Sequence, residues 1–154
     1  MMMPHTNDYF IQLKRTNTYF LLSLSVLSLV AVLLLEGQIT ARVNVDIDRL
    51  LQGIAVVISL VTVFAGFQSF KKRILAVRRS GDAVSLRLKQ YRNACVGWWL
   101  TLFLPALIYL AFFVATANYA FLVLAIFNCG TIFLFRPRKE NVLLLLNLTE
   151  EDIS

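Results

Sequence analysis

Three long stretches of the chain carry no charged side chain, and they dominate the pattern of the sequence. They cover 16–35, 50–70 and 93–135. The first two match the ~20 apolar residues that a helix needs to cross a hydrocarbon core about 30 Å thick. Open sheet edges cannot face lipid, and the stretches lack the polar alternation of barrel strands. The pattern therefore predicts transmembrane helices.

The third stretch has about twice the length of one span, so it is expected to fold back on itself once. Its weakest part is 115–118, where an asparagine tolerates turn geometry. The sequence therefore predicts an all-α integral membrane four-helix bundle, in which residues 1–154 form a single membrane domain. The expected spans are 17–35, 50–70, 94–115 and 119–135.

The positive charges indicate which way the chain faces. All but two of the 15 Lys and Arg residues fall on one side of the predicted membrane, the exceptions being Arg42 and Arg49. The positive-inside rule then places both chain ends in the cytosol. A cleaved signal peptide is the alternative for the first span, but its apolar run exceeds the usual ~7–15 residues and 39–41 poorly matches a cleavage site.

Most of the cations gather between the second and third spans, in 71–92. The predicted geometry is a basic cytosolic helical hairpin in which the second helix extends to about Arg79 and the chain turns at Gly81. The third helix is expected to start near Ala83, with Asp82 as its N-cap. The hairpin can meet anionic headgroups, at about 1 kcal/mol per cation, or dock an acidic partner. The candidate docking residues are Lys71, Lys72, Arg73, Arg78, Arg79, Arg87, Lys89 and Arg92.

Residues 137–154 form a predicted amphipathic C-terminal tail. Its leucine run is too short to span, so a short helix is expected on the membrane or against the basic hairpin. The acids of 150–152 are available to pair with the hairpin. On the opposite side of the membrane, Asp46 or Asp48 is predicted to cap the second helix.

No Asp, Glu, Lys, Arg or His falls inside a predicted span. Proton relays and ion-coupled carriers usually need such groups at membrane depth, so a proton-coupled transporter is disfavoured. The uncharged polar residues have two interpretations: a small polar pocket or narrow pore, or hydrogen-bonded contacts between helices. This candidate intramembrane polar cluster consists of Ser59, Thr62, Thr101, Asn128 and Thr131.

Composition agrees with a lipid environment, because 58% of the residues are apolar and only 16% are charged. Soluble chains carry about 25% charged residues. The net charge of +6 follows the positive-inside bias and does not indicate nucleic-acid binding. Cys95 and Cys129 both lie in apolar runs, and no P-loop, GxGxxG, GxSxG or HExxH motif is present. No catalytic residue, cofactor or metal site is therefore predicted.

A resemblance lies at the exit of the fourth span, in 135–140, which reads FRPRKE and precedes an apolar, acid-ended tail. This segment resembles uncharacterised small bacterial four-helix inner-membrane proteins. The resemblance implies a bacterial cytoplasmic (inner) membrane and no particular activity. Membrane-associated glutathione and eicosanoid enzymes are similar in size alone, since the polar residues of their first cytosolic loop and second span are missing.

The expected function is that of a non-enzymatic multi-pass membrane protein. It would act as a small subunit, scaffold or regulator through its basic cytosolic hairpin. A homo-oligomeric channel or passive transporter is one alternative, and a lipid-modifying membrane enzyme is another. The expected partners are the lipid bilayer with its anionic headgroups, a membrane or cytosolic protein, or further copies of the chain.

Overall fold

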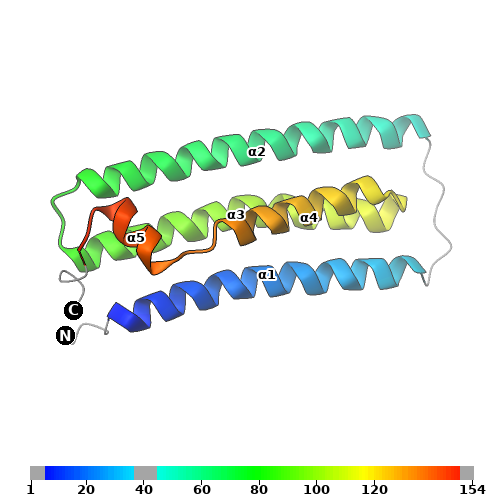
Figure 1. The fold of residues 1–154 in the computed structure, drawn as a ribbon. Helices are drawn as coiled ribbons and strands as arrows, with labels where there is room; N and C mark the ends of the chain where they lie inside the picture. Colours follow the sequence, from blue (N-terminus) through cyan, green and yellow to red (C-terminus); the bar gives the residue numbers. More distant parts are fainter. Residues whose placement is uncertain (1–5, 37–44, 150–154) are drawn as a thin grey trace.

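The computed structural model describes residues 6–36 and 45–149, and the regular structure of this part of the chain is entirely α-helical (Figure 1). At a rise of 1.5 Å per residue, three helices measure about 47–53 Å, against about 24 Å for the fourth and about 12 Å for the fifth. The helices are α1 (Thr6–Glu36), α2 (Val45–Arg79), α3 (Val84–Thr116), α4 (Tyr119–Leu134) and α5 (Lys139–Leu146).

Three of these helices, α1, α2 and α3, are long and apolar enough to cross a membrane. The chain therefore has the architecture of a multi-pass membrane protein. The helix α4 meets the same criterion only together with α5, and the two are bent by 74° where they join. A fourth crossing thus depends on this broken pair acting as one span.

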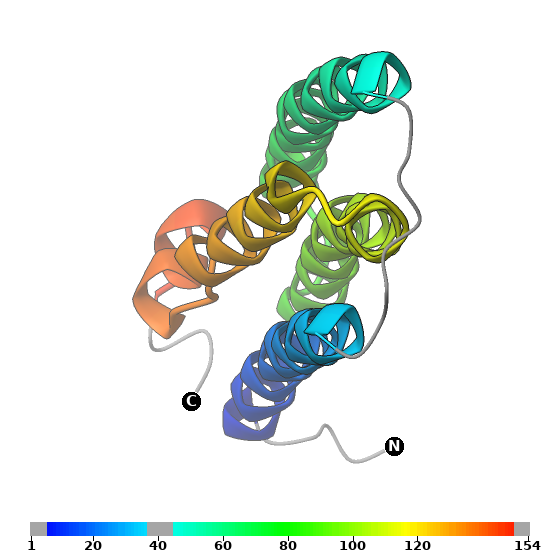
Figure 2. The same ribbon diagram turned by 90° about the vertical axis from the view of Figure 1, so that its right-hand side faces the viewer.

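The helix α3 lies at the centre of the molecule. It contacts α1, α2 and α4, while α1 and α2 lie on opposite sides of the α3–α4 pair (Figure 1; Figure 2). Only 11% of the most apolar window of α1, and 11% of that of α2, is buried inside the protein, against 33% for α3. The apolar outer faces of α1 and α2 are unfavourable in water at ~25 cal/mol per Å², and lipid removes this penalty.

The turn between α2 and α3 follows the predicted hairpin, except at its cap. The helix α2 ends at Arg79, and α3 has Ala83 in the N-cap position with no side-chain cap hydrogen bond. The prediction that Asp82 caps α3 is wrong. Its carboxylate lies one residue before the cap and accepts a hydrogen bond from Nε2 of Gln90 at 3.2 Å.

The reversal between α3 and α4 falls inside the predicted segment 115–118. Ala117 takes the left-handed conformation (φ 55°), which ends α3. Oδ1 of Asn118 then accepts a hydrogen bond from the backbone N–H of Ala120 at 3.0 Å. Asn118 is therefore the N-cap of α4, a position that asparagine favours.

The predicted cap of α2 by Asp46 or Asp48 is also wrong. Both residues lie inside the first turn of α2, which begins at Val45. Acidic groups there are favourable because they face the positive end of the helix dipole. The carboxylate of Asp48 instead accepts a hydrogen bond from Nδ2 of Asn118, which ties α2 to the start of α4.

The C-terminal helix α5 packs against the end of the α2–α3 hairpin. Val142 and Leu146 are 0% exposed and join the apolar cluster that includes Trp99 of α3. A side-chain nitrogen of Arg87 donates a hydrogen bond to the carbonyl of Leu146. Of the two positions predicted for the tail, the structure has the one against the hairpin. The acids of 150–152 lie outside the described residues, as does Arg42.

Candidate functional site

The short length of α4 creates two cavities at one end of the molecule. The helix α4 stops at Leu134 after about 24 Å, while α2 and α3 continue beside it. The chain then passes through a linker, residues 135–138, and bends by 74° into α5. One cavity lies between the linker, α2 and α3, and the other lies between the linker and α1. We call them the aromatic cavity and the basic hollow.

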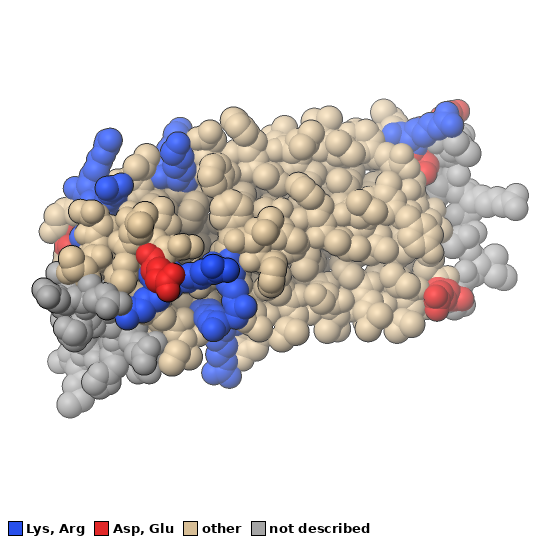
Figure 3. Space-filling view, in the orientation of Figure 1, with Lys and Arg blue, Asp and Glu red and all other residues tan. Residues whose placement is uncertain are grey.

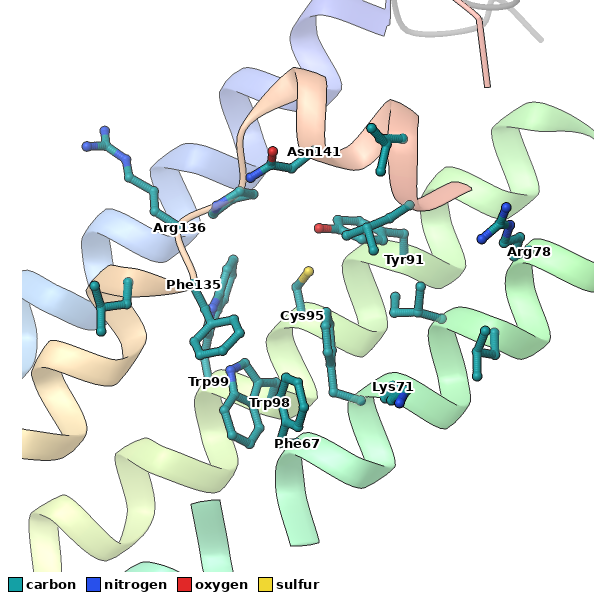
Figure 4. Close-up of a pocket in the computed structure, with 17 residues that line it drawn as sticks. Phe67, Lys71, Arg78, Tyr91, Cys95, Trp98, Trp99, Phe135, Arg136 and Asn141 are labelled. Atoms are coloured by element: carbon teal, nitrogen blue, oxygen red, sulfur yellow. The ribbon is translucent and has the colours of Figure 1, made fainter. Parts of the chain in front are cut away.

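The aromatic cavity has a volume of about 610 Å³ and is enclosed by α2, α3, the linker and α5 (Figure 4). This volume falls within the ~300–1,000 Å³ of small-molecule sites. Most of its lining is apolar, as is typical of such sites. Its aromatic members are Phe67, Phe70, Tyr91, Trp98, Trp99 and Phe135.

Three aromatic rings from three segments meet at the end of the cavity nearest the middle of the helices. The ring centroids of Trp98 and Phe135 are 5.7 Å apart at 79°, and those of Phe67 and Trp98 are 6.2 Å apart at 66°. Such edge-to-face pairs are favourable. The Trp98 ring can lie here because Gly66 has no side chain: a Cβ on Gly66 would be 2.5 Å from Cζ3 of Trp98.

The polar groups of the aromatic cavity point to binding. Figure 4 shows the Cys95 thiol and the Tyr91 ring directed into the cavity. Lys71 and Arg78 are exposed on its α2 edge, whereas the side chain of Arg136 extends away from it in the same view. In the described chain no three His, Cys, Asp or Glu residues are grouped to hold a metal ion. The arrangement suits an apolar group that carries a negative charge.

The structure divides the predicted docking residues among different places. Lys71 and Arg78 line the aromatic cavity. Arg73 lines a small hollow of about 60 Å³ between α2 and α3. Arg87 is bonded to the carbonyl of Leu146 and so holds α5 in place. The remaining predicted docking residues do not line the aromatic cavity: Lys72, Arg79, Lys89 and Arg92.

The predicted intramembrane polar cluster is not assembled around the aromatic cavity. The hydroxyls of Thr101 and Thr131 donate to carbonyls four residues earlier in their own helices, at 2.7 and 2.9 Å. Ser59 and Asn128 are buried, and their side-chain polar atoms have no hydrogen-bond partner. Thr62 is half-buried. The two threonine hydroxyls thus bond within their own helices.

One buried polar residue escaped the sequence analysis. Asn17 in α1 is 0% exposed, and neither its side-chain nitrogen nor its oxygen has a hydrogen-bond partner. The side-chain nitrogen and oxygen of Asn128 in α4 also have no hydrogen-bond partner, and α1 contacts α4. Helical spacing could have indicated its burial. Asn17 lies on the same face of α1 as the fully buried Leu13 and Leu24.

The basic hollow has a volume of about 720 Å³ and lies between α1, the end of α4, the linker and the start of α5. Four cations line it: Lys14, Arg136, Arg138 and Lys139. None of the described acids is part of its lining. Figure 3 shows blue side chains gathered on this face, toward the end that carries the α2–α3 turn, with a red acidic side chain beside them and an uncharged surface beyond. The sequence places these cations on one side of the membrane but gives no indication that they share a hollow.

The fold and these cavities define a class, that of small multi-pass helical membrane proteins with a hollow, basic end. No protein-family model, curated protein or solved structure matches the chain. The function of the two cavities therefore has to be argued from their own residues.

Proposed function

We propose that the chain is a non-enzymatic membrane protein that acts by association, as a small docking subunit of the bacterial cytoplasmic membrane. In this proposal α4 with the first residue of the linker is the fourth span, α5 lies at the basic end, and both chain ends lie in the cytosol. The observation that carries it is the aromatic cavity, which combines an apolar lining with two exposed cations.

The charges of the hairpin support association with an acidic partner. Lys72, Arg79 and Lys89 are exposed, and none forms an ion pair with an acid in the part of the chain that the structure describes. Unpaired cations of this kind steer an acidic partner toward a surface and speed association. They belong to the same α2–α3 hairpin as Lys71 and Arg78, which line the aromatic cavity.

The rigidity of this end also supports docking. The Tyr9 hydroxyl donates to the carbonyl of Leu88, so the start of α1 is tied to the start of α3. Arg87 bonds the end of α5, and Val142 is fully buried beneath it. A surface held in this way loses little conformational entropy when a partner binds.

The partner is expected to present an apolar side chain flanked by acidic ones. Aromatic-lined, desolvated cavities are the usual place of binding hot spots. The apolar side chain would enter the cavity against Trp98 and Phe135, and the acids would pair with Lys71 and Arg78. A channel or a lipid-modifying enzyme receives less support, because none of the polar residues predicted to line a pore lines either large cavity.

Site-specific photo-crosslinking in the host membrane tests this proposal. A crosslinker at Leu75, which lines the cavity and is 40% exposed, should yield a protein adduct of one defined mass. A crosslinker at Leu60, 61% exposed on the same helix, should yield none. Reversing both cavity charges, Lys71→Glu with Arg78→Glu, should abolish the adduct.

The matched control is Arg15→Glu with Arg138→Glu, which reverses two charges at the same end but outside the aromatic cavity. This variant should keep the adduct. A position-75 crosslinker that captures only lipid, or an adduct equally reduced in both double variants, would contradict docking at the cavity.

A further inference from the structure

The basic hollow gathers like charges from three separate segments. Lys14 comes from α1, Arg136 and Arg138 from the linker, and Lys139 from the start of α5. Lys139 already has another interaction, which leaves Lys14, Arg136 and Arg138. None of these three forms an ion pair with an acid of the described chain, and Glu140, next to them in α5, does not line the hollow. Cations that converge in a hollow whose described lining contains no acid favour an external anion.

The depth of Arg136 indicates where such an anion lies. Arg136 comes two residues after the end of α4, which is about 24 Å long, while the hydrocarbon core is about 30 Å thick. The end of α4 therefore holds this guanidinium near the boundary between acyl chains and headgroups. An unpaired Arg is unfavourable inside hydrocarbon, and its long stem lets the charge reach the headgroup level.

The walls of the hollow are apolar on the side of the helices. Phe10 and Ile11 of α1 face Phe133 and Leu134 of α4 across it. A site lined by cations at one edge and by apolar side chains at the other matches an amphiphile better than a free ion. Basic pockets between transmembrane helices are known to hold anionic lipid headgroups.

The start of α5 adds backbone donors beside the same hollow. Arg138 is the N-cap of α5 and makes no side-chain cap hydrogen bond. The first N–H groups of a helix have no partner within the helix, and the helix dipole makes this end attractive to phosphate. Asn141, in the first turn, also lines the hollow.

We propose that the basic hollow binds one anionic phospholipid of the surrounding bilayer. Its phosphate pairs with Lys14, Arg136 and Arg138, and the upper part of one acyl chain runs along Phe10 and Phe133. The lipid fills the space left where α4 stops, and it joins the linker to α1. This inference does not depend on the docking proposal. The docking partner pairs with Lys71 and Arg78, whereas the lipid pairs with Lys14, Arg136 and Arg138.

Native mass spectrometry of the full chain tests the proposal. The protein is released from mixed micelles that hold equal amounts of phosphatidylglycerol and phosphatidylcholine. The wild type should retain one phosphatidylglycerol in preference to phosphatidylcholine. The hollow variant, Lys14→Gln with Arg136→Gln and Arg138→Gln, should bind it roughly a hundredfold more weakly, since each cation contributes about fivefold.

The matched control is Arg15→Gln with Lys72→Gln and Arg79→Gln. It also removes three cations, and none of them lines the basic hollow. Arg15 already donates to the Tyr19 hydroxyl at 2.8 Å. This variant should retain phosphatidylglycerol like the wild type. Equal loss in both variants, or equal retention of phosphatidylcholine, would overturn the proposal.

Two further arms keep the test decisive. If the hollow variant does not fold, the single change Arg136→Gln should still weaken retention about fivefold, and unchanged retention would count against the site. Excess inorganic phosphate should not displace the lipid, because it lacks the acyl chain. Displacement would mean that the hollow takes free phosphate, and the lipid assignment would be wrong.

Discussion

The two ends of the helical assembly differ in how they are closed. At the end where α3 turns into α4, which we call the closed end, Asn118 caps α4 and bonds Asp48 of α2. Phe113 and Phe121 are both 0% exposed just below this turn. At the opposite, open end, α4 has stopped, and two cavities of about 610 and 720 Å³ flank the linker.

This difference follows from helix length. The helix α4 measures about 24 Å, while α3 beside it measures about 50 Å. The helix α3 ends and α4 begins at their shared turn, so α4 runs beside the second half of α3 only, and α5 lies near its first half. The cations of 136–139 come directly after that point. A short helix therefore both opens the cavities and places charge at their rims.

The largest expected effect comes from truncating an aromatic side chain at each end. Phe113→Ala at the closed end should lower the free energy of unfolding by about 3–5 kcal/mol, because the fully buried ring leaves a cavity. Phe135→Ala at the open end should cost only about 1 kcal/mol, since its ring is 42% exposed and contributes mainly its aromatic contacts. Chemical unfolding in detergent measures both. Equal losses would remove the contrast between the ends.

A pair of glycines in α2 tests the packing that supports the aromatic cavity. Gly66→Ala should destabilise the protein by about 1–3 kcal/mol, because the new Cβ would overlap the Trp98 ring. Gly53→Ala is the matched control, since nothing lies within 4 Å of its Cβ, and it should stabilise by about 0.5–1 kcal/mol. Thermal unfolding followed by tryptophan fluorescence reports both changes. A tolerated Gly66→Ala would mean that Trp98 is not held as described.

The helices and their reversal could be predicted from the sequence, because they follow from local features. Uncharged stretches set α1, α2 and α3, and Asn118 lies at the turn within the longest stretch. The predicted caps of α2 and α3 were wrong because a cap rule uses only nearby residues. The hydrogen-bond partners of Asp48 and Asp82 lie 70 and 8 residues away, and a cap rule considers only neighbours a few residues apart.

The two cavities could not be predicted, because they depend on how segments far apart in the sequence meet. The basic hollow joins Lys14 to Arg136, and the aromatic cavity joins Phe67 to Phe135. The bend of 74° after Leu134 shapes both cavities, and no residue pattern in the sequence specifies this angle. Asn17 was missed because its polarity matters only once a neighbouring helix buries it.

Asn128, a buried asparagine between the two ends, gives a prediction in which the substitution stabilises the protein. Asn128→Leu should raise the free energy of unfolding by about 1–3 kcal/mol, because the amide of Asn128 is buried without a hydrogen-bond partner. Unfolding in detergent measures the gain. Thr131→Val is a useful comparison, since its hydroxyl already bonds the carbonyl of Phe127 and its loss should be nearly neutral. A destabilising Asn128→Leu would mean that the amide has a hydrogen-bond partner in the membrane, which would contradict this prediction.

The smallest expected effect separates a true helix cap from an apparent one. Asn118→Ala should lower the free energy of unfolding by about 1 kcal/mol, because it removes the cap of α4. It also removes the bond to Asp48 that closes this end of the molecule. Asp82→Ala, at the open end, should change stability by less than about 0.5 kcal/mol, since Asp82 is exposed and caps no helix. Hydrogen exchange at Ala120 and at Arg87 measures each helix start separately. Equal loss of protection at the two positions would contradict this prediction. It would mean that Asp82 stabilises the start of α3 as much as Asn118 stabilises the start of α4.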